Sequence, residues 1–356
     1  MQRLPAILAL FVFALGGGPA GAQAVGAAGS SVGAAAASQS AATAAGTRSI
    51  YGSVPCSTGS GPGPLCDTQP GMSERFKAES EAKRPASGMP ANWTQPIAPF
   101  HIVGNIYYVG TAGLAAYLFT SPNGLVLLDG TLRETADQVE RNIVTLGYRV
   151  GDVKILLNSH AHYDHAGGLR QLKQDTGAKL YASAGDRGAL ESGAPPSDTS
   201  YGLMAIPPVK VDRAVVDGEP VRLGSILLIP LITPGHTPGC TSWATTAFEN
   251  GTPLRVMIPC SLTVAGNKLI GNKGYPGIVA DFRRTFTRFR KLDADVVLPV
   301  HPELADVIGR GRRAASGSPD AFLMPGMLAK MVADAGKAFD AELEKQDDAA
   351  HQRSRY

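Results

Sequence analysis

The sequence predicts an α/β domain in which layered β-sheets are covered by helices. Strand-like apolar runs and amphipathic helical segments are interspersed from Trp93 onward, as in chains that build sheets with helices packed outside them. The 356 residues are 44% hydrophobic and 18% charged, a composition that allows a large buried core. With 42 glycines and 26 prolines, the elements should be short and joined by tight turns.

The N-terminus has the parts of a secretory signal peptide. Arg3 supplies a basic start, residues 4–15 form an apolar run, and Ala22-Gln23-Ala24 matches a cleavage signal. The apolar run is too short to span a bilayer comfortably. We therefore expect a signal peptide at 1–24 and export to the periplasm, with an uncleaved membrane anchor as the alternative.

Four segments follow from composition. Residues 25–46 are almost entirely Ala, Gly and Ser, and the loop-rich 47–92 continues them, so 25–92 is predicted to be a tether and N-terminal segment. The compact domain should occupy 93–346, and 347–356 is a polar tail. The formal charge of +3 is too small to indicate nucleic-acid binding. We expect a monomer that acts on a small molecule and has no membrane contact after signal cleavage.

The first half of the domain alternates strands and helices. Apolar runs predict strands at 100–110, 115–122 and 124–130, separated by Gly-containing turns. Val139, Ile143 and Leu146 recur at helical spacing within 132–147, and Gly147 is placed to end that helix. A buried strand at 152–159, a helix at 166–177 and a strand at 179–183 follow.

The second half begins with a strand at 223–233. Two strand-like runs, 241–248 and 252–258, then flank the turn 249–251 and predict a hairpin. A helix at 279–292, a strand at 295–301 and an amphipathic closing helix at 321–346 complete the domain.

The cysteines are even in number, which suits an oxidising compartment. Cys56 and Cys66 bracket a short Gly/Pro/Ser loop and could form a local disulfide. Cys240 and Cys260 flank the predicted hairpin, and a turn centred on Asn250 would place them directly opposite each other. A cross-strand disulfide is the preferred reading, with free thiols as the alternative.

Three loops at predicted strand ends hold five of the seven histidines. Because such loops meet at one edge of a sheet, their side chains can converge on one site. Imidazole and carboxylate ligands without thiolate favour zinc, with iron or manganese as weaker options. The alternative is a set of hydrogen-bonded loop histidines, a reading that suits His101 and His351 better. The candidate ligands are His160, His162, Asp164, His165, His236 and His301.

The motifs around these residues resemble the metallo-β-lactamase superfamily and, within it, the third subclass of class B β-lactamases. They are "HAHYDHAGG", "GHTPGCTSW", "CSLTVAGNKL" and "PVHPE", in that order. The resemblance implies an αββα sandwich of two mixed β-sheets flanked by helices. It implies an enzyme that opens the β-lactam ring of penicillins, cephalosporins and carbapenems by a zinc-bound hydroxide, without a covalent intermediate, and so confers antibiotic resistance.

The resemblance also assigns roles to individual residues. Two zinc ions per chain are implied, the first held by His160, His162 and His236 and the second by Asp164, His165 and His301. Asp164 would also orient the attacking hydroxide.

Further residues are assigned to the substrate. Ser261 and Thr263 would hold the substrate carboxylate, and Tyr201 would belong to a wall of the pocket. Asn267 lies where some relatives carry an oxyanion-stabilising tyrosine, although it could equally be a turn residue. Cys260 lies close to a position that another subclass uses as a zinc ligand.

Two other functions compete with β-lactam hydrolysis. A glyoxalase-II-like thioesterase or a lactonase would share the scaffold, but such relatives usually carry a bridging aspartate before the "SL" turn. Here that stretch reads "IPCSL". A zinc-binding protein without catalysis would not need Ser261 and Thr263 beside the metal.

Overall fold

The computed structural model describes residues 89–199 and 205–353. The predicted signal peptide, the greater part of the 25–92 segment, the Cys56–Cys66 pair and Tyr201 lie outside the described residues.

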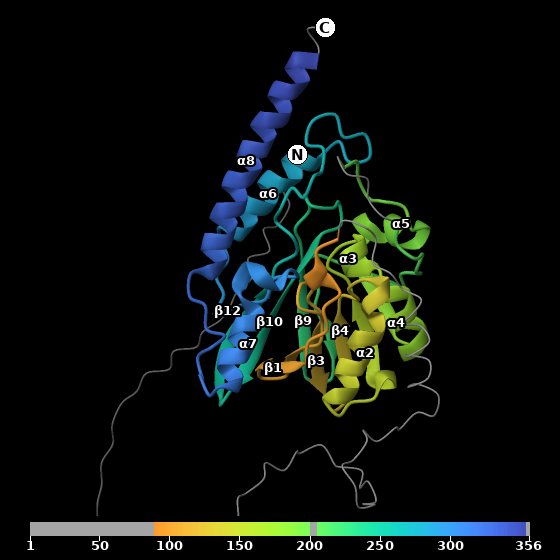
Figure 1. Ribbon diagram of the computed structural model, residues 1–356, viewed down its shortest axis with the longest axis vertical. Helices are drawn as coiled ribbons and strands as arrows, with labels where there is room; N and C mark the ends of the chain where they lie inside the picture. Colours follow the sequence, from red (N-terminus) through yellow and green to blue (C-terminus); the bar gives the residue numbers. More distant parts are fainter. Residues whose placement is uncertain (1–88, 200–204, 354–356) are drawn as a thin grey trace, which may run out of the picture. The chain divides into compact units, whose positions relative to one another are not determined.

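Two mixed β-sheets form the centre of the fold (Figure 1). Within the described residues, the first sheet has seven strands in sequence order: β1 (Phe100–Val103), β2 (Ile106–Tyr108), β3 (Tyr117–Ser121), β4 (Gly124–Leu128), β5 (Val153–Leu157), β6 (Lys179–Ser183) and β7 (Arg213–Val215). Strands β1 to β4 pair antiparallel, and β4 to β7 pair parallel.

The second sheet has five strands in the described part of the chain, in the order β12-β11-β10-β9-β8. They are β8 (Val221–Leu223), β9 (Ile226–Ile232), β10 (Thr241–Glu249), β11 (Thr252–Ile258) and β12 (Val296–Val297). The pairing of β11 with β12 is parallel and the others are antiparallel.

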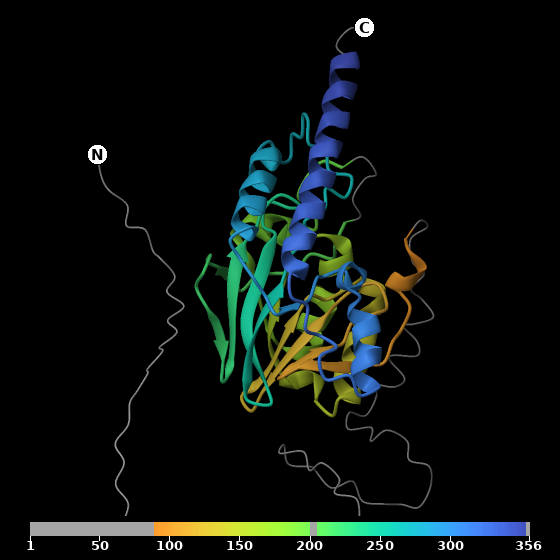
Figure 2. The ribbon, with the colours of Figure 1, turned by 90° about the vertical axis from the view of Figure 1, so that its left-hand side faces the viewer.

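Helices lie on the outer side of both sheets (Figures 1 and 2). On the side of the first sheet are α2 (Ala136–Thr145), α3 (Tyr163–Ala166), α4 (Leu169–Thr176) and α5 (Ala184–Ser192). On the other side are α6 (Ile278–Phe289), α7 (Val307–Ala315) and α8 (Met327–Arg353). Short 3₁₀ turns occur at Ala91–Trp93, Arg133–Thr135, Val150–Asp152 and Pro302–Ala305. The predicted αββα sandwich is confirmed. No helix within these described ranges is long and apolar enough to cross a membrane.

Alternation along the strands divides the core into two layers. On β4, Leu125 and Leu127 point to α2 and α4, whereas Val126 and Leu128 point to the second sheet. This period of two is what a strand buried on both faces requires. The first sheet therefore holds the two layers together.

Two expectations about the second half need correction. The hairpin register differs by one residue, because Glu249 pairs with Thr252 around a two-residue Asn250-Gly251 turn with φ of 51° and 82°. Asn-Gly is the dipeptide that such a left-handed two-residue turn favours. The closing helix begins at Met327, after Pro325 and Gly326, rather than at 321.

The C-terminal helix docks through aromatic packing. Phe339 of α8 is 1% exposed, and its ring lies 5.0 Å from that of Phe282 and 5.6 Å from that of Phe286, both on α6. Helix α8 is thereby fixed beside α6, and its last turns extend beyond the sheets (Figure 2).

Phe339→Ala should lower the free energy of unfolding by about 3–5 kcal/mol, because it leaves a cavity between α6 and α8. Urea denaturation of the purified protein measures the change. Phe248→Ala is the matched control, since Phe248 is 64% exposed. An equal loss in the two variants would show that the packing of α8 is not the cause.

Candidate metal centre

The candidate ligands meet at the edge where strands of both sheets end. Strand β5 leads into His160, His162, Asp164 and His165, the last two on the short helix α3. Strand β9 leads into the turn that carries His236, and β12 leads into His301. The structure thus brings all six predicted ligands together from three strand ends, as the topology of an α/β sheet allows.

The first group consists of His160, His162 and His236. One ring nitrogen from each lies within 4.8 Å of the others. The three rings are 4.6–4.9 Å apart between centroids and are steeply inclined to one another. All three side chains are buried, with residue exposures of 1%, 5% and 3%. Three ring nitrogens this close together could hold one metal ion.

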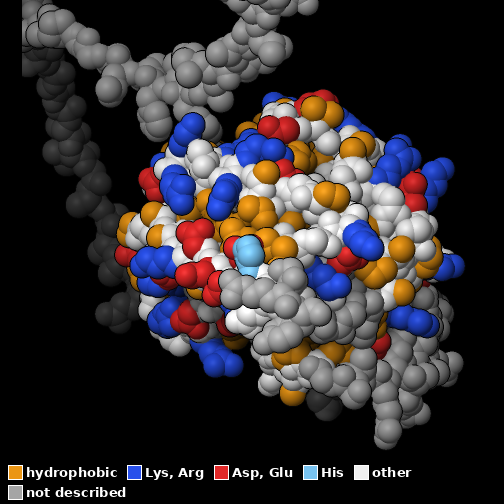
Figure 3. Space-filling model, turned by 90° about the horizontal axis from the view of Figure 1, so that it is seen from above, with side chains coloured by type: hydrophobic (Ala, Val, Ile, Leu, Met, Phe, Trp, Pro, Cys, Tyr) orange, Lys and Arg blue, Asp and Glu red, His pale blue; other side chains and the backbone are white. Residues whose placement is uncertain are grey.

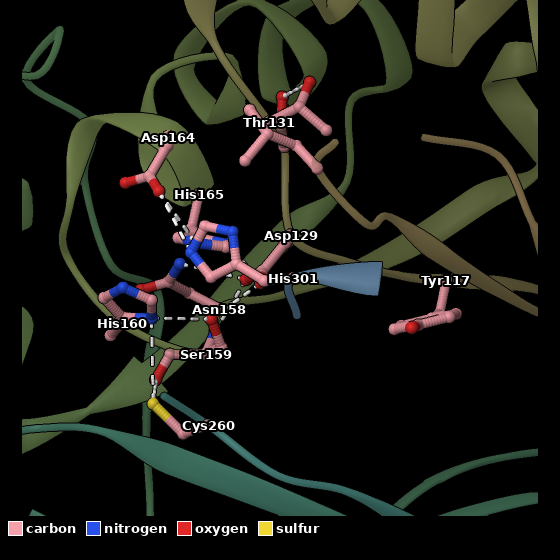
Figure 4. Close-up of polar contacts among 12 residues, drawn as sticks. Tyr117, Asp129, Thr131, Asn158, Ser159, His160, Asp164, His165, Cys260 and His301 are labelled. Carbon is pink, nitrogen blue, oxygen red and sulfur yellow. Dashed lines mark hydrogen bonds and ion pairs between the residues drawn. The ribbon is translucent and has the colours of Figure 1, made fainter. Parts of the chain in front are cut away.

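The second group consists of Asp164, His165 and His301. Oδ2 of Asp164 lies 3.2 Å from Nε2 of His165 and 3.4 Å from Nε2 of His301. The two Nε2 atoms are 3.3 Å apart (Figure 4). Since His160 and His165 have ring centroids only 4.3 Å apart, the two groups are neighbours.

Hydrogen bonds fix the tautomers of two histidines in the first group. The Ser159 hydroxyl donates to Oδ2 of Asp129 at 2.6 Å, so it must accept from Nδ1–H of His160 at 3.0 Å. Nδ1 of His236 lies 2.7 Å from the carbonyl oxygen of Thr263, which can only accept. Nε2 of both rings therefore carries the free lone pair that a metal needs.

Unpartnered nitrogens test whether the site fits a metal. Nε2 of His160 and Nε2 of His162 are buried and have no hydrogen-bond partner among the described residues. A buried acceptor without a partner is costly, and a metal ion would use its lone pair. With imidazole and carboxylate as donors, the residues present fit zinc.

Burial and charge act in opposite directions on the histidine pKa values. Burial holds the pKa of His160 and His236 well below the usual value and lowers that of His162 to about 4. For His165, burial also opposes protonation, but the carboxylates of Asp164 and Asp129 outweigh it and raise the pKa to about 10. A divalent cation at the second group would replace this proton.

Asp129 is a site residue that sequence reasoning missed. It follows β4, is 1% exposed, and accepts hydrogen bonds from the side chain of Asn158 and from the backbone and hydroxyl of Ser159. Its Oδ2 also lies 3.3 Å from Nδ1 of His165. Through Ser159 it orients His160, so one carboxylate supports a ligand in each group (Figure 4). Its position directly after a buried strand was the available signal.

The predicted carboxylate-binding residues lie beside the metal groups. The hydroxyls of Ser261 and Thr263 are 3.0 Å apart, with Ser261 buried and Thr263 exposed.

Cys260 forms a disulfide with Cys240, and its sulfur lies 3.7 Å from Nδ1 of His160. Both cysteines lie just beyond the paired residues of the hairpin, so the bond forms despite the shifted register. In this bonded form Cys260 is not a thiolate ligand.

The amide hydrogens of Asn267, which the resemblance assigns to the substrate, are engaged within the protein. Its side chain is fully buried, and its two amide hydrogens are directed to the carbonyl oxygens of His236 and Val264. Asn267 therefore holds the His236 turn in place.

Basic and acidic side chains are interspersed across the face seen from above (Figure 3), which agrees with the small net charge.

The chain matches solved structures of similar fold over nearly the whole length of those structures. The chain is 41% identical to BJP-1, a subclass B3 metallo-β-lactamase of Bradyrhizobium japonicum, over 73% of this chain and 98% of that one, with a TM-score of 0.70. It is 33% identical to native FEZ-1 metallo-β-lactamase from Legionella gormanii over 73% and 99%, with a TM-score of 0.69. Residues 112–247 match the family model of the metallo-β-lactamase superfamily.

Curated sequences give shorter matches. The chain is 38% identical over 93 residues to a hydroxyacylglutathione hydrolase of Methylococcus capsulatus, which is 26% of this chain and 28% of that protein. It is 34% identical over 84 residues to one from Rhodospirillum rubrum, 24% and 26% of the two chains. The chain thus spans about a quarter of the length of these two relatives.

The metal-free protein should lose stability as pH rises from about 6.5 to about 10. The folded state keeps the His165 proton up to pH 10, whereas the unfolded chain releases it near 6.5, so the folded state binds more protons in this window. Chemical denaturation across pH, with chelator, measures the slope. His165→Ala should flatten it, and an unchanged slope in that variant would contradict the assignment.

Asp129→Asn should weaken metal binding about 10- to 100-fold. The substitution removes a carboxylate that His165 contacts directly and that orients His160 through the Ser159 hydroxyl. Competition with a chromophoric chelator measures the affinity. Asp212→Asn provides a control, since Asp212 pairs with Lys173 and accepts from the backbone of Leu180, away from the ligand loops. Equal affinities of Asp129→Asn and the native protein would exclude a supporting role for this carboxylate.

Proposed function

The chain belongs to the metallo-β-lactamase superfamily, and from this membership we propose that this metallo-hydrolase opens β-lactam rings with two zinc ions bound per chain. The observation that carries the proposal is the pair of adjacent three-residue groups, one with three imidazoles and one with two imidazoles and a carboxylate. The first would hold one zinc through His160, His162 and His236. The second would hold another through Asp164, His165 and His301.

Two zinc ions, when bound, supply a water of lowered pKa and Lewis acidity toward a carbonyl oxygen. No serine or cysteine nucleophile is then required, and the reaction proceeds without a covalent intermediate.

The chain's own residues orient the reactants. In the metal-free protein burial raises the pKa of Asp164, but the neighbouring His165 and His301 outweigh it and hold that pKa well below its usual value, so the carboxylate is ionised. An ionised Oδ atom can only accept, and through such a hydrogen bond it would orient the attacking water. The hydroxyls of Ser261 and Thr263 lie together and would hold the carboxylate of the substrate.

A glyoxalase-II-like thioesterase or a lactonase is the second candidate. The short matches to hydroxyacylglutathione hydrolases favour it. Against it, the segment after β11 places disulfide-bonded Cys260 before Ser261, where the bridging aspartate of such enzymes is expected. The near-complete coverage of B3 structures supports the β-lactamase assignment.

The proposed location is the periplasm. The signal-like residues 1–24 support it, and the Cys240–Cys260 disulfide suits an oxidising compartment. Hydrolysis there would inactivate antibiotics before they reach their targets and so confer resistance.

Zinc-loaded mature protein should hydrolyse a carbapenem and a cephalosporin, seen as loss of lactam absorbance that a chelator stops. Intact lactam in the presence of two protein-bound zinc ions would move the assignment to a thioesterase or lactonase. A thioester and a lactone assayed in parallel separate these cases.

His162→Ala should reduce turnover by about 100-fold or more, since removing a ligand costs at least as much as removing a residue that supports one. His101→Ala is the matched control, because His101 is exposed and bonds only to the carbonyl of Gly104 among the described residues. Circular dichroism checks that both variants fold. Substantial turnover by folded His162→Ala would contradict the dizinc assignment.

A further inference from the structure

A second buried carboxylate, Asp186, joins the two loops that supply the first group of histidines. It lies in the first turn of α5 and is 1% exposed. Its Oδ2 accepts from the backbone nitrogen of Ala161 at 2.8 Å and from the hydroxyl of Thr237 at 2.7 Å. Its Oδ1 accepts from the backbone nitrogen of Gly239 at 2.7 Å.

These donors are next to the ligands in the chain. Ala161 separates His160 from His162, and Thr237 directly follows His236. Asp186 itself makes none of its hydrogen bonds to an imidazole. Its carboxylate therefore bridges the backbones that carry all three histidines of the first group.

Glycines allow α5 to approach the His236 turn closely. A Cβ on Gly239 would lie 2.1 Å from the Ser183 hydroxyl and 2.5 Å from Cγ of Asp186. A Cβ on Gly185 would lie 2.6 Å from the carbonyl oxygen of Pro238. Ser183 completes the contact by donating to the carbonyl oxygen of Gly239 at 2.7 Å. The contact between α5 and this turn leaves no room for a side chain at either glycine.

The donors require an ionised acceptor. Burial raises the pKa of Asp186, hydrogen bonds from Thr237, Ala161 and Gly239 lower it, and the outcome is a pKa of about 6. At neutral pH the group is therefore mainly a carboxylate, which can accept from all three donors.

We propose that Asp186 is a positioning residue that sets the spacing between the His160–His162 loop and the His236 turn, and thereby the zinc affinity of the first group. It acts through hydrogen bonds from two backbone N–H groups and the Thr237 hydroxyl, and it touches neither the metal nor the substrate. The inference rests on the zinc site of the proposed function and adds a determinant that lies outside the ligand motifs.

Asparagine cannot reproduce this arrangement. Its single oxygen can face either Ala161 and Thr237 or Gly239, and its amide group then points at the remaining backbone N–H. In both orientations one buried backbone donor is left unpaired. Asp186→Asn thus changes the spacing of the loops with little change in side-chain volume.

The test follows each histidine separately during zinc titration. Protein labelled with ¹⁵N-histidine is titrated in zinc buffers, and the imidazole ¹⁵N resonances report binding at each group. In Asp186→Asn, the resonances of His160, His162 and His236 should shift only at about 10- to 100-fold higher free zinc than in the native protein. Those of His165 and His301 should shift at the native zinc concentration.

Two further variants separate positioning from general destabilisation. Thr237→Val removes one donor without leaving a backbone N–H unpaired, and it should weaken the first group about two- to tenfold. Asp212→Asn is the matched control, because Asp212 accepts from the backbone of Leu180 and pairs with Lys173 away from the ligand loops. It should leave both groups unchanged.

Several outcomes would overturn the inference. One is an Asp186→Asn variant whose first group responds at the same free zinc concentration as in the native protein. Another is a loss of zinc affinity that is equal in the two groups and equal in Asp186→Asn and Asp212→Asn. A native protein whose histidines do not respond to zinc would overturn the proposed function as well. If the native protein binds zinc at both groups but does not hydrolyse a lactam, only the proposed substrate is overturned. The role of Asp186 is then still decided by the zinc titration of Asp186→Asn.

Discussion

The candidate metal centre depends on the buried carboxylate of Asp129. The backbone of Asp129 is left-handed, with φ of 66°. A residue other than glycine holds this conformation only when its surroundings compensate the strain. Here the compensation comes from the surroundings of the carboxylate. Asn158 and Ser159 donate hydrogen bonds to it, and Nδ1 of His165 lies 3.3 Å from Oδ2. Strands β4 and β5 are parallel neighbours, so their ends place Asp129 beneath the ligand loop. The orientation of a ligand in each group thus follows from one strand pairing.

The other half of the centre comes from the second sheet and is held differently. His236 is fixed by the carbonyl of Thr263, and its own carbonyl accepts from buried Asn267. The Cys240–Cys260 disulfide ties the His236 turn to the Ser261 loop. Asp186 connects these loops to the first sheet. The site is therefore assembled where the two sheets meet, and its precision depends on contacts between segments that are distant in sequence.

This arrangement explains which parts could be predicted from sequence. The six candidate ligands, which the structure brings together, could be named because four lie in one short motif and the others follow strong apolar strands. Asn267 could not be interpreted, because only tertiary contacts show that its amide hydrogens are used. The hairpin register differed by one residue because the two-residue turn at Asn250-Gly251 sets the pairing. Helices α5 and α7 were missed, since Gly185, Gly188, Gly309 and Gly311 within them weaken a helical pattern.

The donor set also bears on the choice between the two candidate chemistries. The six candidate ligands include a single carboxylate, Asp164, and the bonded sulfur of Cys260 adds no negative charge. Two divalent ions in such a site would keep a net positive charge within a buried environment, where charges interact more strongly than in water. An additional bridging aspartate would reduce that charge. With a single carboxylate among its candidate ligands and Asp129 behind them, such a centre would suit a substrate that brings its own carboxylate to the Ser261 and Thr263 hydroxyls. This electrostatic balance is consistent with the proposed β-lactam substrate.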